Sequence, residues 1–214
     1  YIISNPPFGI EWKVEKNAVE AEHKKGTSGR FGVGLPKISD GQMLFDLNGI
    51  AKLKETGKMA IIHNGSSLFT GQAGSGESEI RRYIIENDWL EAIVQLPNDT
   101  FYNTGITTYI WIISKCKPEH RKGKVQLINA SNMCENRRKN IGNKRVDITE
   151  KYREVVVRAF GEFENKSYEI DGKICESKIF DNIEFGFSRI QIESPLYDEN
   201  GNVVIKGKKV APDS

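Results

Sequence analysis

The 214-residue sequence has the length of one domain with room for a hydrophobic core, and its 38% hydrophobic and 28% charged residues are typical of a globular protein. No apolar run approaches the roughly 20 residues that a membrane-spanning helix needs, so we expect no membrane association. The 31 Lys and Arg nearly balance the 29 Asp and Glu, so only local charge clusters can indicate nucleic acid. The three widely spaced cysteines, Cys116, Cys134 and Cys175, predict no disulfide framework and favour a cytoplasmic location.

The N-terminal residues lie inside an apolar, strand-like run, residues 1–4, with no initiating Met and no signal peptide. We therefore interpret the chain as a piece of a longer protein. The sequence Asn5-Pro6-Pro7-Phe8 follows directly, and its prolines end the strand because they lack backbone donors. We interpret residues 11–37 as a mobile connection that ends in a glycine-rich loop.

An alternation of helices and strands follows. Residues 39–57 predict a helix, 58–63 a buried strand, 64–76 a glycine-rich loop, 77–86 a helix, 90–96 a strand, 98–105 a loop and 107–114 a strand. The last two strands are too close in sequence for a crossover helix, so we expect them to pair antiparallel. Residues 125–128 predict an edge strand.

The pattern changes after residue 129. A basic stretch precedes a helix over residues 149–163, and strands at 187–196 and 203–205 flank a turn at 198–202. We predict that residues 1–130 form part of a doubly wound, Rossmann-like α/β sheet, mostly parallel with an antiparallel strand near its end. Residues 131–214 would form a small α+β appendage of a basic loop, a helix and a β-hairpin.

Asn5-Pro6-Pro7-Phe8 is the strongest candidate for catalysis, because ligands bind at the carboxyl ends of strands in open α/β sheets. The Asn5 amide oxygen and the Pro6 carbonyl can both accept hydrogen bonds from one exocyclic amine. Phe8 offers a flat face on which an extruded base can stack. Acceptors so placed hold an NH2 group out of conjugation, which leaves its lone pair free to attack a methyl sulfonium. The structural alternative is a strand-ending turn with a buried Phe.

The motif resembles the catalytic motif of amino-group DNA methyltransferases, and the chain is similar to the modification subunit of bacterial type I restriction-modification systems. The same resemblance extends through RFGVGLP at 30–36, the run from Leu68 to Pro97, FYNTGI with TYIWIISK behind it, and KGKVQLINAS at 122–131. It implies methyl transfer from S-adenosylmethionine to N6 of adenine in duplex DNA, with residues 5–8 as the catalytic motif. It also implies separate specificity and restriction subunits as partners.

One part of the family pattern is missing from this sequence. The glycine-rich cofactor loop and its following acidic residue should precede Asn5, so the cofactor-binding residues stay unassigned and we expect the isolated chain to be inactive. An interrupted sheet would also expose an edge, so we expect self-association, or an edge covered by the chain's own tail. The rival hypothesis is a non-catalytic DNA-binding or assembly scaffold of a restriction-modification complex.

Two loops allow further interpretations. Gly71 and Gly76 have the spacing of a phosphate-binding loop, but Glu77 stands where that loop needs Lys, so we do not expect nucleotide hydrolysis. The family resemblance places this loop near the target base or the DNA. Residues 103–106 are favoured as a hairpin loop, although Phe101 and Tyr102 could wall a base pocket.

Two basic clusters are candidates for contact with DNA phosphates. The first has five cations in nine residues without an acid, and its members are the predicted DNA-binding residues: Arg137, Arg138, Lys139, Lys144 and Arg145. The alternative for this cluster is a solvated surface. The second cluster is interpreted mainly as solvated: Lys115, Lys117, Arg121, Lys122 and Lys124. The scattered histidines and Cys134 predict neither a metal site nor a cysteine nucleophile.

Overall fold

The computed structural model describes residues 1–190, 192, 194–206 and 209–210. Its helices are α1 (Lys16–His23), α2 (Gln42–Lys52), α3 (Ser66–Phe69), α4 (Gly76–Glu86) and α5 (Glu150–Glu162), with the 3-10 turns η1 (Gly26–Ser28), η2 (Glu119–Arg121) and η3 (Asn182–Phe185). Its strands are β1 (Ile2–Ser4), β2 (Lys58–Asn64), β3 (Leu90–Gln95), β4 (Thr108–Ser114), β5 (Lys124–Asn129), β6 (Glu135–Ile141), β7 (Lys144–Asp147), β8 (Lys166–Ile170), β9 (Lys173–Asp181), β10 (Ile205–Lys206) and β11 (Lys209–Val210). None of these described helices combines the length and apolar character needed to cross a membrane.

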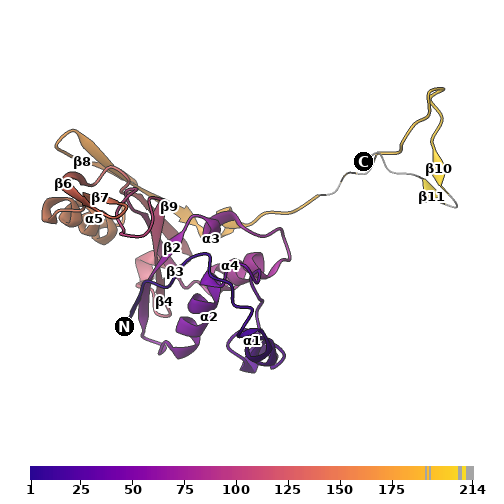
Figure 1. Ribbon diagram of the computed structural model, residues 1–214, viewed down its shortest axis with the longest axis horizontal. Coiled ribbons are helices and arrows are strands. Elements are labelled where there is room, and N and C mark those ends of the chain that lie inside the picture. The colour runs from indigo at the N-terminus through magenta and orange to yellow at the C-terminus, as the bar shows by residue number, and fades with distance from the viewer. Residues whose placement is uncertain (191, 193, 207–208, 211–214) are drawn as a thin grey trace.

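Seven strands form one sheet in the order β1-β2-β4-β3-β5-β9-β8 (Figure 1). β1 runs parallel to β2, and β3 runs parallel to β5. β4 is antiparallel to both of its neighbours, which confirms the predicted pairing of residues 90–96 with 107–114. β4 therefore lies reversed between β2 and β3, inside the sheet, and β9 is a second reversed strand, between β5 and β8.

Helices cover both faces of this sheet. On one face, α2 and α4 bury Leu47, Ile50 and Ile84 against Met59 and Trp111 of the sheet. On the other face, α5 covers the part of the sheet that contains β5, β9 and β8. The buried cluster there combines residues of α5 with residues of the strands: Tyr152, Val155 and Ala159 from the helix, and Val94, Ile128, Tyr168 and Cys175 from the sheet. Apolar residues at helical spacing on the helices and at alternate positions on the strands drive both interfaces. This arrangement confirms the predicted α/β class with a Rossmann-like sheet.

Several predicted elements differ from the structure. Residues 11–37 are not only a connection, because α1 forms there and buries Val19. β5 is not an edge strand, because β9 pairs with its outer side. The predicted basic loop is a two-stranded hairpin of β6 and β7. The seven-stranded sheet crosses the predicted domain boundary at residue 130, and the division itself stays a prediction.

The C-terminal strand prediction is confirmed only around its turn. Tyr197 and Val203 form an antiparallel bridge, and the Asp198 N–H donates to the Asn202 carbonyl at 2.8 Å. Residues 187–190 form no strand, and the prediction also falls on residues 191 and 193, which lie outside the described residues. β10 and β11 make a separate two-stranded sheet (Figure 1).

Buried ion pairs lie at the amino edge of the sheet, where β2, β3 and β5 begin. The Glu91 carboxylate, 1% exposed, lies 3.0 Å from the Lys58 Nζ and 3.5 Å from the Arg121 Nε. The Lys117 Nζ lies 2.6 Å from the Asp88 carboxylate. The interpretation of the second basic cluster as solvated is therefore wrong for Lys117 and Arg121, because both are buried.

Candidate active site at the carboxyl edge of the sheet

Four segments meet at the carboxyl edge of the sheet. Ser4, the last residue of β1, pairs with Ile61 of β2, and the end of β2 pairs with the start of β4. The end of β3 pairs with the end of β5. The Asn5-Phe8 motif, residues 65–69, the loop 96–107 and the chain entering β6 therefore emerge from one edge. The loop 103–106 therefore lies at the same edge of the sheet as the Asn5-Phe8 motif, because β1, β2 and β3 run in the same direction.

The Asn5-Phe8 motif leaves β1 with its first side chain open to solvent. Asn5 is exposed, Pro6 is buried, and Phe8 is half-buried. Within the described part of the chain, the Asn5 amide has no hydrogen-bond partner, so it is available to a ligand. Gly9 follows with φ +61, a conformation that favours glycine, and turns the chain toward α2. There the Ile10 carbonyl accepts a hydrogen bond from the Gly41 N–H at 3.1 Å.

A polar network next to this motif fixes the end of β2. The Gln42 Nε2, which has two hydrogens to donate, lies within hydrogen-bond distance of Asp40, Asn64 and Ser66 at 2.7, 2.9 and 2.6 Å. The Gln42 Oε1 accepts from the Asn64 N–H at 3.3 Å, so both ends of the amide have a partner. The same network thus joins the N-terminus of α2 to the start of α3.

The network continues inward to a buried histidine that sequence reasoning missed. His63 and Asp46 are both 0% exposed, and the His63 Nε2 lies 2.8 Å from the Asp46 carboxylate. The His63 Nδ1 lies 3.1 Å from the Gln42 Oε1. The partners are 17 and 21 residues apart, so no local spacing in the sequence indicates this set. No group of three or more metal-ligating His, Cys, Asp or Glu occurs among the described residues.

The loop between β3 and β4 contains a tight turn that a bridge between Phe101 and Thr104 closes, in line with the hairpin-loop interpretation. Its Tyr102 side chain is 57% exposed. The Gly105 backbone lies close to Asp99, where an added Cβ would come within 2.7 Å of the carboxylate. The role of Phe101 and Tyr102 as walls of a base pocket stays a prediction.

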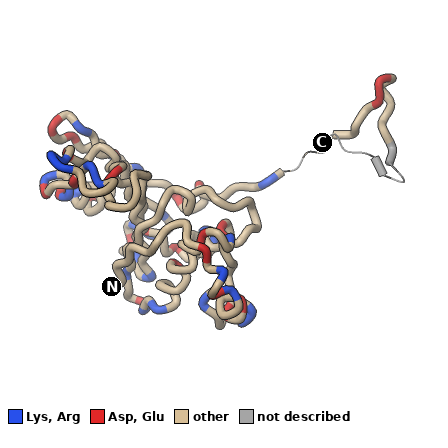
Figure 2. Tube along the Cα trace, viewed as in Figure 1, with Lys and Arg blue, Asp and Glu red and all other residues tan. Residues whose placement is uncertain are grey.

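The predicted DNA-binding cations divide into two groups on the β6–β7 hairpin, which Figure 2 shows as a concentration of Lys and Arg. Arg137 and Lys144 both pair with Asp147, and these ion pairs hold the pKa of that carboxyl below its usual range. Arg138, Lys139 and Arg145 are exposed and have no ion pair among the described residues.

The glycine-rich loop before α4 has a structural role. Ser75 caps α4, because its hydroxyl accepts a hydrogen bond from the Ser78 N–H. Glu77 is 6% exposed, and its Oε1 accepts from the Lys37 N–H at 2.9 Å. A Cβ on Gly76 would lie 1.7 Å from the Leu35 carbonyl, so glycine is required for this contact. The loop thus holds residues 30–37 against α4.

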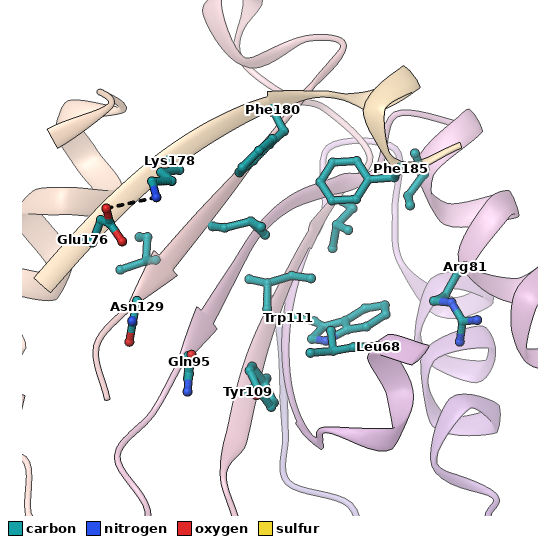
Figure 3. A pocket seen from close by; sticks show the side chains of 15 residues that line it. Leu68, Arg81, Gln95, Tyr109, Trp111, Asn129, Glu176, Lys178, Phe180 and Phe185 are labelled. Carbon is teal, nitrogen blue, oxygen red and sulfur yellow. Dashed lines mark ion pairs between the residues drawn. The ribbon is translucent and has the colours of Figure 1, made fainter. Parts of the chain in front are cut away.

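Two of the cavities formed by the described residues differ in their position relative to the Asn5-Phe8 motif. One of about 440 Å³ opens on the face that α4 covers only in part, with Trp111, Phe180 and Phe185 among its lining residues (Figure 3). None of the Asn5-Phe8 residues or the hairpin cations lines it. A second cavity of about 380 Å³ is lined by Pro7 together with apolar residues of α1 and α2. The motif is therefore next to the second cavity and away from the first.

The thiols do not resemble catalytic nucleophiles. Burial raises the pKa of Cys134, and it raises the pKa of Cys175 to about 11. A nucleophilic cysteine needs the opposite shift, because the thiolate is the reactive form.

Comparison with known proteins identifies the family. Residues 1–188 match the family described as N-6 DNA Methylase. The chain belongs to this family. The type I restriction enzyme MjaIX methylase subunit of Methanocaldococcus jannaschii is 32% identical over 213 residues, which are 98% of this chain and 34% of that protein. The HindI methylase subunit of Haemophilus influenzae is 31% identical over 61% of this chain and 27% of its own length.

Solved structures show the same fold. The methyltransferase subunit of a type I restriction-modification system from Streptococcus thermophilus superposes with a TM-score of 0.67 at 24% identity, covering 85% of this chain and 34% of that one. This N-6 DNA methylase chain thus spans about one third of the length of the MjaIX methylase subunit.

Proposed function

We propose that the carboxyl edge of this sheet is the acceptor side of an adenine-N6 DNA methyltransferase active site. The observation that carries the proposal is Asn5, exposed and without a partner, at the end of β1 in a chain of the N-6 DNA methylase family. The neighbouring polar network around Gln42 stiffens the end of β2 beside it. A stiff frame for an unpaired amide is what a preorganised binding site requires.

The chemistry follows from these groups. The Asn5 Oδ1 and the Pro6 carbonyl accept the two N–H bonds of the adenine amine and hold its nitrogen pyramidal. The nitrogen lone pair is then free to attack an electrophilic methyl group, and the amine loses a proton after the transfer. Phe8 stacks on the extruded base. This stacking offsets part of the free energy that the base loses when it leaves the duplex stack.

The methyl donor of such an enzyme would be S-adenosylmethionine, which supplies a methyl sulfonium when bound. The described residues do not assemble a complete site for it. Ile3 on β1 is 89% exposed, and none of the described residues covers the outer side of β1. We therefore assign no cofactor-binding residue in this chain.

The test is Asn5→Ala in the protein expressed with any coding sequence that flanks this chain. Loss of one preorganised hydrogen bond should lower transfer of a radiolabelled methyl group to duplex DNA by about 10²-fold or more. Asn17→Ala on the exposed surface of α1 is the matched control and should leave transfer unchanged. Near-normal transfer by the Asn5 variant would contradict the catalytic assignment.

The relatives' names suggest the assembly in which this site works. The curated relatives are methylase subunits of type I restriction enzymes. We propose duplex DNA and separate specificity and restriction subunits as partners, self-association through the open edge of β1, and a cytoplasmic location. The rival scaffold hypothesis predicts DNA binding by the unmodified protein without methyl transfer, so the same assay separates the two.

A further inference from the structure

The β6–β7 hairpin projects from the same edge as the proposed active site, because β6 follows the carboxyl end of β5. It is the most cationic segment of the chain, with five Lys and Arg between residues 137 and 145. The residues of β6 are almost all exposed, whereas β7 buries Val146. Buried apolar packing therefore does not explain why β6 forms a strand.

Backbone hydrogen bonds fix the hairpin on the loop between β3 and β4. The Asn143 N–H donates to the Tyr102 carbonyl at 2.8 Å, and the Arg145 N–H donates to the Asp99 carbonyl at 3.0 Å. Gly142, with φ +58, brings its backbone against Tyr102, where a Cβ would lie 2.7 Å from the carbonyl oxygen. The hairpin and this loop therefore form one unit.

The distance from this unit to Asn5 suits a duplex that lies across the edge. The loop spans β3 and β4, which are two to three strands from β1, or about 10 to 15 Å at a spacing of about 4.8 Å. Phosphates of one DNA strand recur about every 3.4 Å along the helix axis. The loop on which the hairpin is anchored therefore lies about three to four nucleotides from a base held at Asn5.

We propose that Arg138, Lys139 and Arg145 bind the phosphodiester backbone of the duplex beside the target adenine, while Arg137 and Lys144 shape the hairpin through Asp147. This inference rests on the proposed function, because it takes DNA as the substrate of the same edge. The three exposed cations lie on two antiparallel strands and make no ion pair among the described residues. Such contacts position a duplex and carry no sequence information.

The test replaces Arg138, Lys139 and Arg145 together with Gln and measures equilibrium binding to random-sequence duplex DNA without cofactor. Affinity should fall roughly tenfold or more, and the slope of log affinity against log salt should decrease by about 2 to 3, since each phosphate contact contributes about 0.9. The matched control is Lys52, Lys54 and Lys124 to Gln. These are exposed cations at the opposite edge with no ion pair among the described residues, so binding should not change.

A second variant, Arg138→Lys with Arg145→Lys, keeps the charges and should bind with the wild-type salt slope. Circular dichroism checks that each variant is folded. Unchanged binding by the triple variant would overturn the proposal. So would a variant that binds random-sequence DNA normally but no longer prefers one DNA sequence. DNA binding is measured without methyl transfer. A failure of the catalytic role of Asn5 would therefore appear only in the methyl-transfer assay, and a failure of the hairpin proposal only in the binding assay.

Discussion

At the amino edge of the sheet Glu91, Lys117 and Arg121 form buried ion pairs, whereas at the carboxyl edge the cations of the β6–β7 hairpin are largely exposed. Arg121 is 4% exposed, with its guanidinium between the rings of Phe160 and Phe163 at 4.3 Å from each centroid. Arg138 and Arg145 are exposed without an ion pair in the described residues. A buried charge needs partners to offset desolvation, while an exposed cation remains available to a ligand.

The two edges also differ in what holds them together. At the amino edge, the Lys117 ammonium donates to Asp88 and to the Lys124 carbonyl at 2.6 and 2.7 Å. Burial alone would raise the pKa of Asp88, but hydrogen bonds from Lys117, the Gly123 N–H and Asn182 hold it below its usual range. We expect substitutions at the amino edge to change stability, and those at the carboxyl edge to change binding and catalysis.

The largest expected stability effect is at Arg121. Arg121→Met keeps the apolar stem but removes the donor to Gln126 and Phe160 and a cation beside Glu91. Removing one partner of a buried ion pair costs about 3 to 5 kcal/mol, which urea unfolding measures. Lys122→Met, at an exposed surface pair, is the control and should change stability much less than Arg121→Met does. An equal loss of stability in the two variants would contradict the view that buried ion pairs hold the amino edge together.

A smaller effect is expected where the hairpin contacts the loop. Gly142→Ala meets both an unfavourable φ and the Tyr102 carbonyl, so the hairpin should lose its fixed position and methyl transfer should fall roughly tenfold. Gly172→Ala is a matched control, because Gly172 has φ +70 and nothing within 4 Å of its added Cβ. Initial rates of methyl transfer compare the two. If both variants lose the same activity, backbone strain explains the loss and the contact with Tyr102 does not.

The smallest expected effect concerns pH. Because the pKa of Asp88 is lower in the folded state, its ionised form contributes stability above the unfolded pKa, and this contribution is lost as pH falls through the folded pKa. After allowance for solvent screening, Asp88→Asn should destabilise by about 1 kcal/mol at neutral pH. The difference from wild type should disappear in strongly acidic solution, as unfolding titrations measure. A difference that does not depend on pH would show that packing explains the loss.

The sequence predicts the local features of the fold well. Strong periodicity and turn residues indicate α4, β2, the antiparallel β3–β4 pair and α5 close to their observed bounds. The hairpin was missed because residues 135–141 lack the alternation of a half-buried strand. Its only local signal is Gly142 next to Asn143, and its main support comes from Asp99 and Tyr102, about 40 residues earlier.

The candidate site also has one part that consecutive residues indicate and one part that depends on residues far apart in the sequence. The Asn5-Phe8 motif is visible because its chemistry lies in consecutive residues. The network of Gln42, Asp46 and His63 depends on α2 packing beside the end of β2, so only the tertiary structure reveals it. The two basic clusters look alike as sequence. The acids Asp88 and Glu91 that pair with the second cluster lie about 30 residues away from it.

The position of β4 also constrains how the chain assembles during synthesis. β4 emerges after β3 but lies between β3 and β2, so β2 and β3 cannot form the finished pairing before residue 114 is made. The local β3–β4 hairpin closes a short loop and is favoured to form first, because short loops cost little entropy. β2 then pairs with the free side of β4, and β5 pairs with the free side of β3. A ribosome that pauses before residue 108 therefore leaves one side of β2, whose other side pairs with β1, and both sides of β3 without a partner strand. These sides are open to chaperones and to aggregation.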